Sequence, residues 1–191
     1  GHLRENFLTA LKLPVAGIHL DCVRGGEELA QAIDWLPATK ILSVGMIDGR
    51  NIWKTDLDAV LTRLEGLHTR LGDRLWLAPS CSLQHVPVSL AAEKRLDPEI
   101  KNWLAFADEK LAELTTLKTA LNQGRAAVAA IMDDNRAALN SRRHSGRVHK
   151  PEVSARMATL RQSDAARTAP FTLRQPQQRA RLQLPVFPTT T

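Results

Sequence analysis

The sequence predicts an α/β protein with a parallel sheet, for two reasons. Short apolar segments alternate with amphipathic helical segments along its first half, and polar or glycine-containing loops separate them. The strand candidates are 15–20, 40–47 and 75–78, and the helix candidates between and before them are 3–13, 27–36 and 55–71. Strand, helix, strand, helix, strand at these spacings is typical of βαβ units with right-handed crossovers.

The helix candidates have recognisable ends. Pro14 ends the first, Thr55 or Asp56 can cap the third at its start, and Gly72 terminates it. A longer helix is predicted from Asp97 at its N-cap to Gly124 at its C-cap, with Pro98 at the first helical position. Its apolar stripe indicates packing rather than a cofactor site. The stripe consists of Ile100, Leu104, Ala107, Leu111, Leu114, Leu117 and Leu121.

Beyond Gly124 the pattern loosens. An alanine-rich helix is predicted over 126–139 and a shorter one over about 151–160. Four prolines then predict extended pieces with one short helical turn, and 185–191 is typical of a linker that enters another unit. The prolines are Pro170, Pro176, Pro185 and Pro188.

Three strands are too few for a closed barrel, and a three-stranded parallel sheet leaves two edges unpaired. We therefore expect self-association through these sheet edges. The chain also lacks an initiator Met and opens within a predicted helix, which indicates a cut or partial chain.

Composition excludes several classes of protein. Hydrophobic residues make up 43% and charged residues 24%, as in soluble globular proteins. No apolar run approaches the roughly 20 residues of a membrane span, and no signal peptide is recognisable. Two cysteines, Cys22 and Cys81, are too few for a disulfide framework and favour a cytoplasmic location.

The net charge of +6 is unevenly distributed. Residues 136–191 hold 11 basic and 2 acidic side chains, whereas residues 1–135 hold 15 basic and 18 acidic ones. This arginine-rich end indicates an alternative function, a module that binds nucleic acid or an acidic partner. Phe171 is the one aromatic residue between 136 and 185, so base-stacking platforms are scarce and nucleic acid is the weaker choice.

Ligands of parallel α/β proteins meet the loops that follow the strands. The polar candidates there are Asp21, Cys22 and Arg24; Asp48, Arg50 and Asn51; and Cys81, Ser82 and His85. A thiol, an imidazole and a carboxylate from separate loops could form a zinc site, but loop polar groups around a buried Cys are the more ordinary interpretation. Arg50 could bind a carboxylate or phosphate, but a structural turn at Asp48-Gly49 with a salt bridge is the more ordinary interpretation. Gly25-Gly26 is a weak anion-binding signal.

Several segments, in order along nearly the whole chain, resemble cobalamin-independent methionine synthase. They are Leu13–Asp21, Gly49–Asp56, Ala78–Pro87, Ile100–Ala107, Arg142–His149 and Leu184–Thr191. The resemblance implies a partial (β/α)₈ TIM barrel of three parallel βα units over 1–124, the end of an N-terminal barrel. A helical and proline-containing connector over 125–191 would lead towards a catalytic barrel.

The resemblance also implies an activity: a zinc-dependent transfer of a methyl group from 5-methyltetrahydrofolate polyglutamate to homocysteine. The zinc and homocysteine residues of the family lie beyond Thr191, so no catalytic, substrate-binding or metal-binding residue is carried over. We expect no zinc on this chain and no activity from it alone. Cys81, in Pro-Ser-Cys-Ser-Leu, is similar to a zinc cysteine of the second barrel and is interpreted as a vestigial zinc position.

Overall fold

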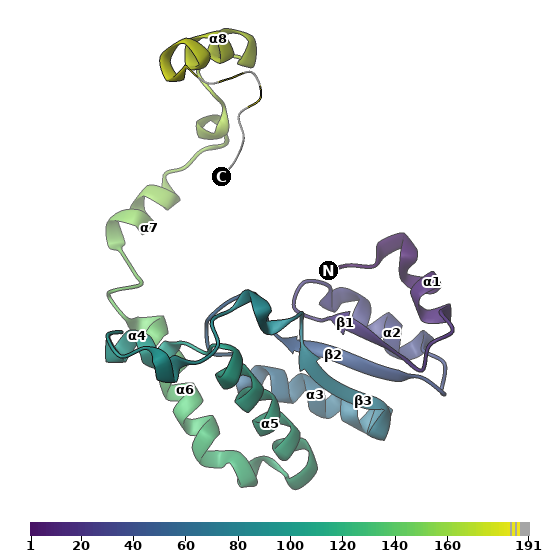
Figure 1. The fold of residues 1–191 in the computed structure, drawn as a ribbon. Coiled ribbons are helices and arrows are strands. Elements are labelled where there is room, and N and C mark those ends of the chain that lie inside the picture. Colours follow the sequence, from purple (N-terminus) through teal and green to yellow (C-terminus); the bar gives the residue numbers. More distant parts are fainter. Residues whose placement is uncertain (184, 186, 188–191) are drawn as a thin grey trace. The chain divides into compact units, whose positions relative to one another are not determined.

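A computed structural model describes residues 1–183, 185 and 187 and confirms the α/β class (Figure 1). Its sheet has three strands in the order β1-β2-β3, with both neighbouring pairs parallel. The strands are β1 (Gly17–Asp21), β2 (Ile41–Ile47) and β3 (Leu75–Pro79). The predicted strands are therefore correct to within two residues.

The helices connect and follow these strands. They are α1 (Phe7–Lys12), α2 (Leu29–Trp35), α3 (Leu57–Leu71), α4 (Pro98–Trp103), α5 (Ala107–Gln123), α6 (Ala129–His144), α7 (Pro151–Ala158) and α8 (Phe171–Leu182). The predicted cap of α3 is confirmed, since the Asp56 carboxylate accepts a hydrogen bond from Ala59 N at 3.0 Å. None of the helices described is long and apolar enough to cross a membrane.

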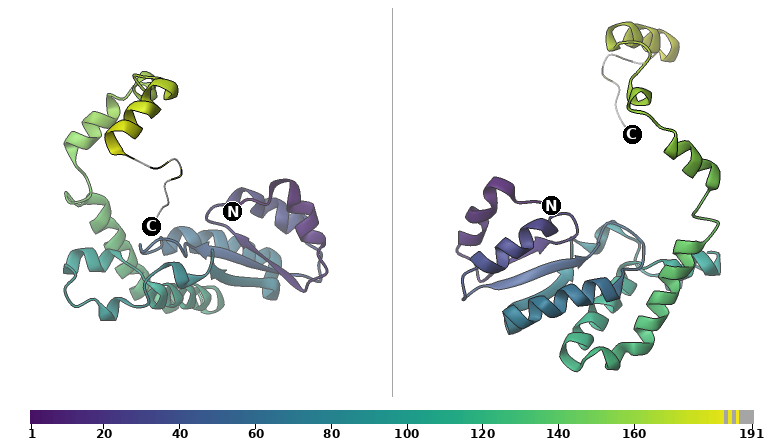
Figure 2. Two further views of the ribbon diagram at one scale, coloured as in Figure 1. Left: turned by 45° about the horizontal axis from the view of Figure 1, so that its top comes forward. Right: turned by 180° about the vertical axis from the view of Figure 1, so that it is seen from behind.

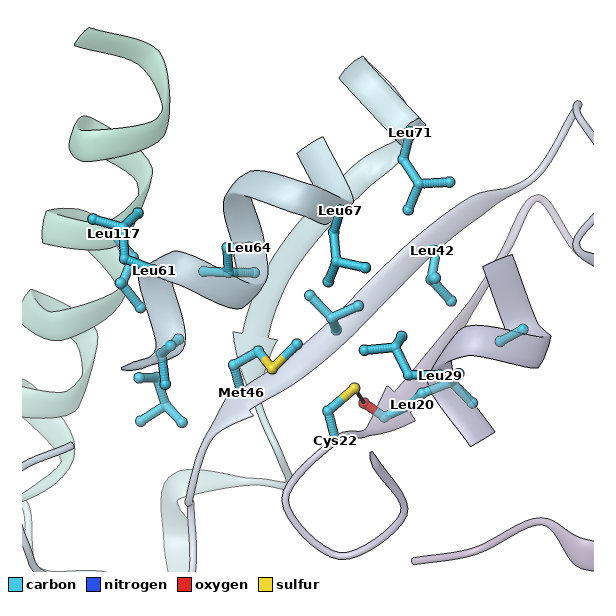
Figure 3. Close-up of a cluster of buried hydrophobic side chains, with 14 of the residues drawn as sticks. Leu20, Cys22, Leu29, Leu42, Met46, Leu61, Leu64, Leu67, Leu71 and Leu117 are labelled. Carbon is cyan, nitrogen blue, oxygen red and sulfur yellow. Dashed lines mark hydrogen bonds between the residues drawn. The ribbon is translucent and has the colours of Figure 1, made fainter. Parts of the chain in front are cut away.

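The larger of two apolar clusters lies between the sheet and its helices (Figure 3), and a smaller one gathers around Leu90, Leu104 and Phe106. Leu42 of β2, Leu61 and Leu64 of α3 and Leu117 of α5 are all fully buried. Burying one such side chain contributes about 1.5–3 kcal/mol. This packing fixes the three strands side by side and so brings the loops after them to the same edge.

The other face of the sheet is open. His19, Ser43 and Trp76 occupy one row across the three strands, and their side chains point away from the core. Trp76 is 58% exposed and His19 is also exposed. Figure 2 shows the same sheet, with α3 along its covered face, from two further directions.

The prediction of one helix from Asp97 to Gly124 is wrong in one respect. Its ends are confirmed, but residues 104–106 separate α4 from α5. There the chain runs alongside residues 52–54: Ala105 N donates to Ile52 O at 2.8 Å, and Lys54 N donates to Trp103 O at 3.0 Å. Backbone pairing with a distant segment thus replaces helical hydrogen bonds.

The predicted apolar stripe is only partly buried. Leu114, Leu117 and Leu121 contact the core, whereas Leu111 is 51% exposed. The most buried positions of α5 include two charged ones, Lys110 and Glu113. The helix therefore turns a partly polar face inward, which the apolar pattern does not indicate.

The chain divides into two compact units, residues 1–145 and 146–191. Helix α6 lies in the first unit and contacts α3 and α4. In the second unit α8 spans twelve residues with Pro176 inside it, longer than the short turn that the prolines predict. Of the predicted linker over 185–191, only residues 185 and 187 are described, and the others lie outside the described residues.

Candidate functional site

The loops after the three strands meet at one edge of the sheet, as predicted; we call this the carboxyl edge. The Arg24 guanidinium donates to both carboxylate oxygens of Asp48, at 3.2 and 3.3 Å, which joins the β1 loop to the β2–α3 loop (residues 48–56). Gly49 N donates to Ser80 Oγ at 3.2 Å, which joins the β2–α3 loop to the β3 loop. The fold therefore brings the three loops together, through the predicted residues Arg24 and Asp48 and through Ser80, which the sequence analysis did not single out.

Asp48 shapes its own loop as well. Its Oδ1 accepts from Arg50 N at 2.9 Å, and its Oδ2 accepts from Asn51 Nδ2 at 3.0 Å. Gly49 fits because it has no side chain: a Cβ there would lie 2.8 Å from Cys81 O. With Arg24 included, both carboxylate oxygens are occupied, so Asp48 organises the loop instead of offering a free base.

Lys110 of α5, which the sequence analysis did not single out, binds the β2–α3 loop from its buried side. Its side chain is fully buried, and its Nζ donates to Asn51 Oδ1 at 3.3 Å and to Trp53 O at 3.1 Å. Burial lowers the pKa of Lys110, and the negative charges of Glu113 and Asp48 oppose that shift. Nothing in the sequence distinguishes Lys110 from other charged residues of this helix, such as Asp108, Glu109 and Lys118.

Glu113 supports the far end of the same loop. Its two oxygens accept from Thr55 N at 2.8 Å and from Thr55 Oγ1 at 2.7 Å. Asn135 of α6 forms two hydrogen bonds with the same segment: its Oδ1 accepts from Leu57 N, and its Nδ2 donates to Thr55 O. Burial raises the pKa of Glu113, although the Thr55 hydrogen bonds and the Lys110 charge act the other way. Lys110 thus holds residues 51 and 53, and Glu113 and Asn135 hold residues 55 and 57.

The β1 loop is held by Asp21. Its Oδ1 accepts from Val23 N and Arg24 N, each at 3.0 Å. Burial of Asp21 disfavours its charged form, but these hydrogen bonds and the amino group of Gly1, which lies 2.9 Å from Asp21 Oδ2, outweigh that effect and lower its pKa. Gly25 precedes a short 3₁₀ turn, Gly26–Glu28, whose first turn already holds the acidic residues Glu27 and Glu28. The Glu28 carboxylate accepts from Leu3 N and Arg4 N.

The possible zinc ligands do not form a donor set. Cys22 is buried, its Sγ donates to Leu20 O at 3.4 Å, and burial raises its pKa to about 11. Cys81 is partly buried and His85 is exposed. Within the described part of the chain, no three His, Cys, Asp or Glu side chains lie together as metal ligands would.

Comparison with known proteins finds two similarities. Residues 1–72 match the family described as "Cobalamin-independent synthase, N-terminal domain". The chain is also 56% identical, over 179 residues, to the 5-methyltetrahydropteroyltriglutamate–homocysteine methyltransferase of Ralstonia pickettii (strain 12J). This match covers 94% of the chain and 23% of the relative's length. The resemblance to cobalamin-independent methionine synthase is thereby confirmed, and the chain spans about a quarter of that relative.

Proposed function

We propose that this chain is a segment of a methyltransferase that makes methionine from homocysteine and 5-methyltetrahydropteroyltriglutamate. The observation that supports this most strongly is 56% identity, over nearly the whole chain, to a relative whose name states that reaction. The carboxyl edge agrees with a supporting role, because the carboxylates of Asp21 and Asp48 are engaged in shaping loops. The segment is therefore a scaffold and is inactive alone.

The three βα units would form the end of an N-terminal (β/α)₈ barrel, with residues 1–124 in the barrel and 125–191 as the connector. The open sheet face supports this proposal, since His19 and Trp76 are exposed in an arrangement that further strands would enclose. So do the two sheet edges, β1 and β3, which each pair with β2 alone. Parallel sheets are normally covered on both faces.

The described residues do not fit a zinc ion, because Cys22 is a buried thiol that donates a hydrogen bond and no group of three ligands is present. We therefore assign no zinc and no catalytic step to this chain, and place both in another part of a longer protein. A cytoplasmic location remains part of the proposal, consistent with two free cysteines.

The test compares this chain with the protein encoded by the complete reading frame. Each is supplied with zinc, homocysteine and 5-methyltetrahydropteroyltriglutamate, and methionine is measured by mass spectrometry. We expect methionine from the complete protein and none above the enzyme-free control from this chain. Methionine formation by this chain at a comparable rate would contradict the scaffold role, and no formation by the complete protein would contradict the reaction.

The second unit favours an alternative function. Residues 146–191 hold 8 basic and 2 acidic side chains, and the described side chains there are mostly exposed. Helices α7 and α8 contain no buried residue, although Val153, Met157 and Phe171 are apolar. A basic and apolar surface of this kind fits an acidic protein partner. Retention on heparin that falls steeply with salt would instead favour nucleic acid.

A further inference from the structure

Arg50 is an exposed residue of the β2–α3 loop, and its guanidinium has no partner among the described residues. The residue is exposed, and its side chain makes no hydrogen bond or ion pair within the described residues, although its backbone N–H is bound. We propose that Arg50 binds a carboxylate of the glutamate chain of the folate substrate. This inference rests on the proposed function and deepens it by naming a residue for one part of the substrate.

The loop holds the Arg50 backbone in one place. The Asp48 carboxylate accepts its N–H, and Asn51, the next residue, is hydrogen-bonded on both sides by Asp48 and Lys110. Gly49, the preceding residue, is bound to Ser80. Three consecutive residues are thus fixed, so binding a ligand at Arg50 requires ordering of one side chain only.

The surrounding charges leave Arg50 uncompensated. Asp48, the nearest acidic residue in sequence, is paired through both oxygens with Arg24. Lys110 and Glu113, which are both buried on α5, carry opposite charges, and the charges of Glu113 and Asp48 both act on Lys110. Asp48 is thus already paired, and the Arg50 guanidinium is left without an acidic partner in residues 48–51, which favours an anionic ligand.

The cost of this arrangement indicates that the loop shape matters. Burying a lysine and a glutamate removes both charges from water, and a connection between a strand and a helix does not require either. Both side chains form hydrogen bonds with the same segment: Lys110 binds residues 51 and 53, and Glu113 binds residue 55. Lys110 is accordingly a positioning residue for Arg50.

The chemistry of the ligand follows from the guanidinium. Its planar fork matches a carboxylate through two parallel hydrogen bonds, which an ammonium cannot reproduce. The substrate named for the relative carries three glutamate units and so several carboxylates. Phosphate could meet the same fork, and the experiment distinguishes the two anions.

The test measures binding of a γ-linked triglutamate peptide, with no pteridine, to the 191-residue chain at low ionic strength by titration of its ¹⁵N NMR spectrum. Arg50→Gln removes the fork, Arg50→Lys keeps the charge, and Lys110→Met frees the loop. Lys118→Gln is the matched control: it removes one exposed charge from α5 beside Leu75 and Trp76, at the start of β3.

We expect wild type and Lys118→Gln to bind alike, with affinity about tenfold lower in Arg50→Gln and intermediate in Arg50→Lys and Lys110→Met. Single glutamate and inorganic phosphate should bind more weakly than the peptide. Equal affinity in wild type and Arg50→Gln, no binding by wild type, or tighter binding of phosphate would overturn the inference. Methyl transfer by the complete protein is a separate readout, so the proposed function can stand or fail independently.

Discussion

The ammonium group of Lys110 lies 3.3 Å from Asn51 Oδ1 and 3.1 Å from the carbonyl oxygen of Trp53, inside a protein whose other buried side chains are mostly apolar. Asn51 in turn donates a hydrogen bond to Asp48, and Asp48 accepts one from Arg24. One buried cation on α5 thus supports two loops of the carboxyl edge.

Replacing Lys110 by Met should destabilise the first unit. The change leaves the carbonyl of Trp53 without its buried donor and Asn51 Oδ1 with Trp53 N alone, and it removes the positive charge beside Glu113. We expect a cost of about 2–4 kcal/mol. The free energy of unfolding from urea titration measures it. Lys118→Met on the exposed side of the same helix is the control, and a change below about 0.5 kcal/mol in both would show that the buried ammonium contributes little.

The two cysteines should differ in reactivity. At pH 8 a thiol of pKa about 11 is ~0.1% thiolate, and Cys22 is also shielded from reagent. Iodoacetamide at pH 8 should therefore modify Cys81, which is partly exposed, and leave Cys22 intact in the folded chain. Mass spectrometry of tryptic peptides checks this. Both residues should react in 8 M urea, and rapid native modification of Cys22 would contradict the observed packing.

Much of the carboxyl edge was predictable from the sequence. Alternation of apolar strands and amphipathic helices fixes a parallel sheet, and parallel strands place Asp21, Asp48 and Cys81 on loops at the same edge. The Asp56 cap and the Gly124 terminus were predictable because capping depends on neighbouring residues only. Local chemistry was sufficient in these cases.

The supporting polar groups were not predictable, because they depend on residues far apart in the sequence. Leu104 leaves the helix since its backbone region pairs with residues 52–54, about fifty positions earlier. Lys110 and Glu113 face inward since that loop offers acceptors and donors to them. An apolar periodicity places leucines on a helix but does not show which charged residue a distant loop will pair with.

Two glycine replacements should act in opposite directions. At Gly45 of β2, a Cβ would lie 2.6 Å from Ser80 Cα and 3.0 Å from His19 Cε1, so Gly45→Ala forces neighbouring strands apart and should destabilise. The expected loss is about 1–3 kcal/mol. At Gly66 of α3 nothing lies within 4 Å, and Gly66→Ala should stabilise the helix by about 0.5–1 kcal/mol. Urea unfolding of both variants beside wild type provides the comparison, and a stabilised Gly45→Ala would be incompatible with this strand spacing.

Glu113 should make the folded chain less stable as the pH rises. Burial raises its folded pKa above the ordinary value of 4.5, so the folded state holds this proton more tightly than the unfolded state. Its contribution is complete below pH 4.5 and is lost as the pH rises through the higher folded pKa.

Unfolding free energies of wild type and Glu113→Gln should be compared between pH 4 and 7. The variant also alters the Thr55 hydrogen bonds, but that offset does not change with pH, so the slope is the informative quantity. Wild type should lose stability relative to Glu113→Gln as the pH rises. Glu65→Gln is the opposite control. The hydrogen bond from Arg125 lowers the pKa of Glu65, so wild type should gain stability relative to Glu65→Gln as the pH rises. Equal slopes for wild type and Glu113→Gln would mean that Glu113 titrates as a solvated carboxylate despite its burial.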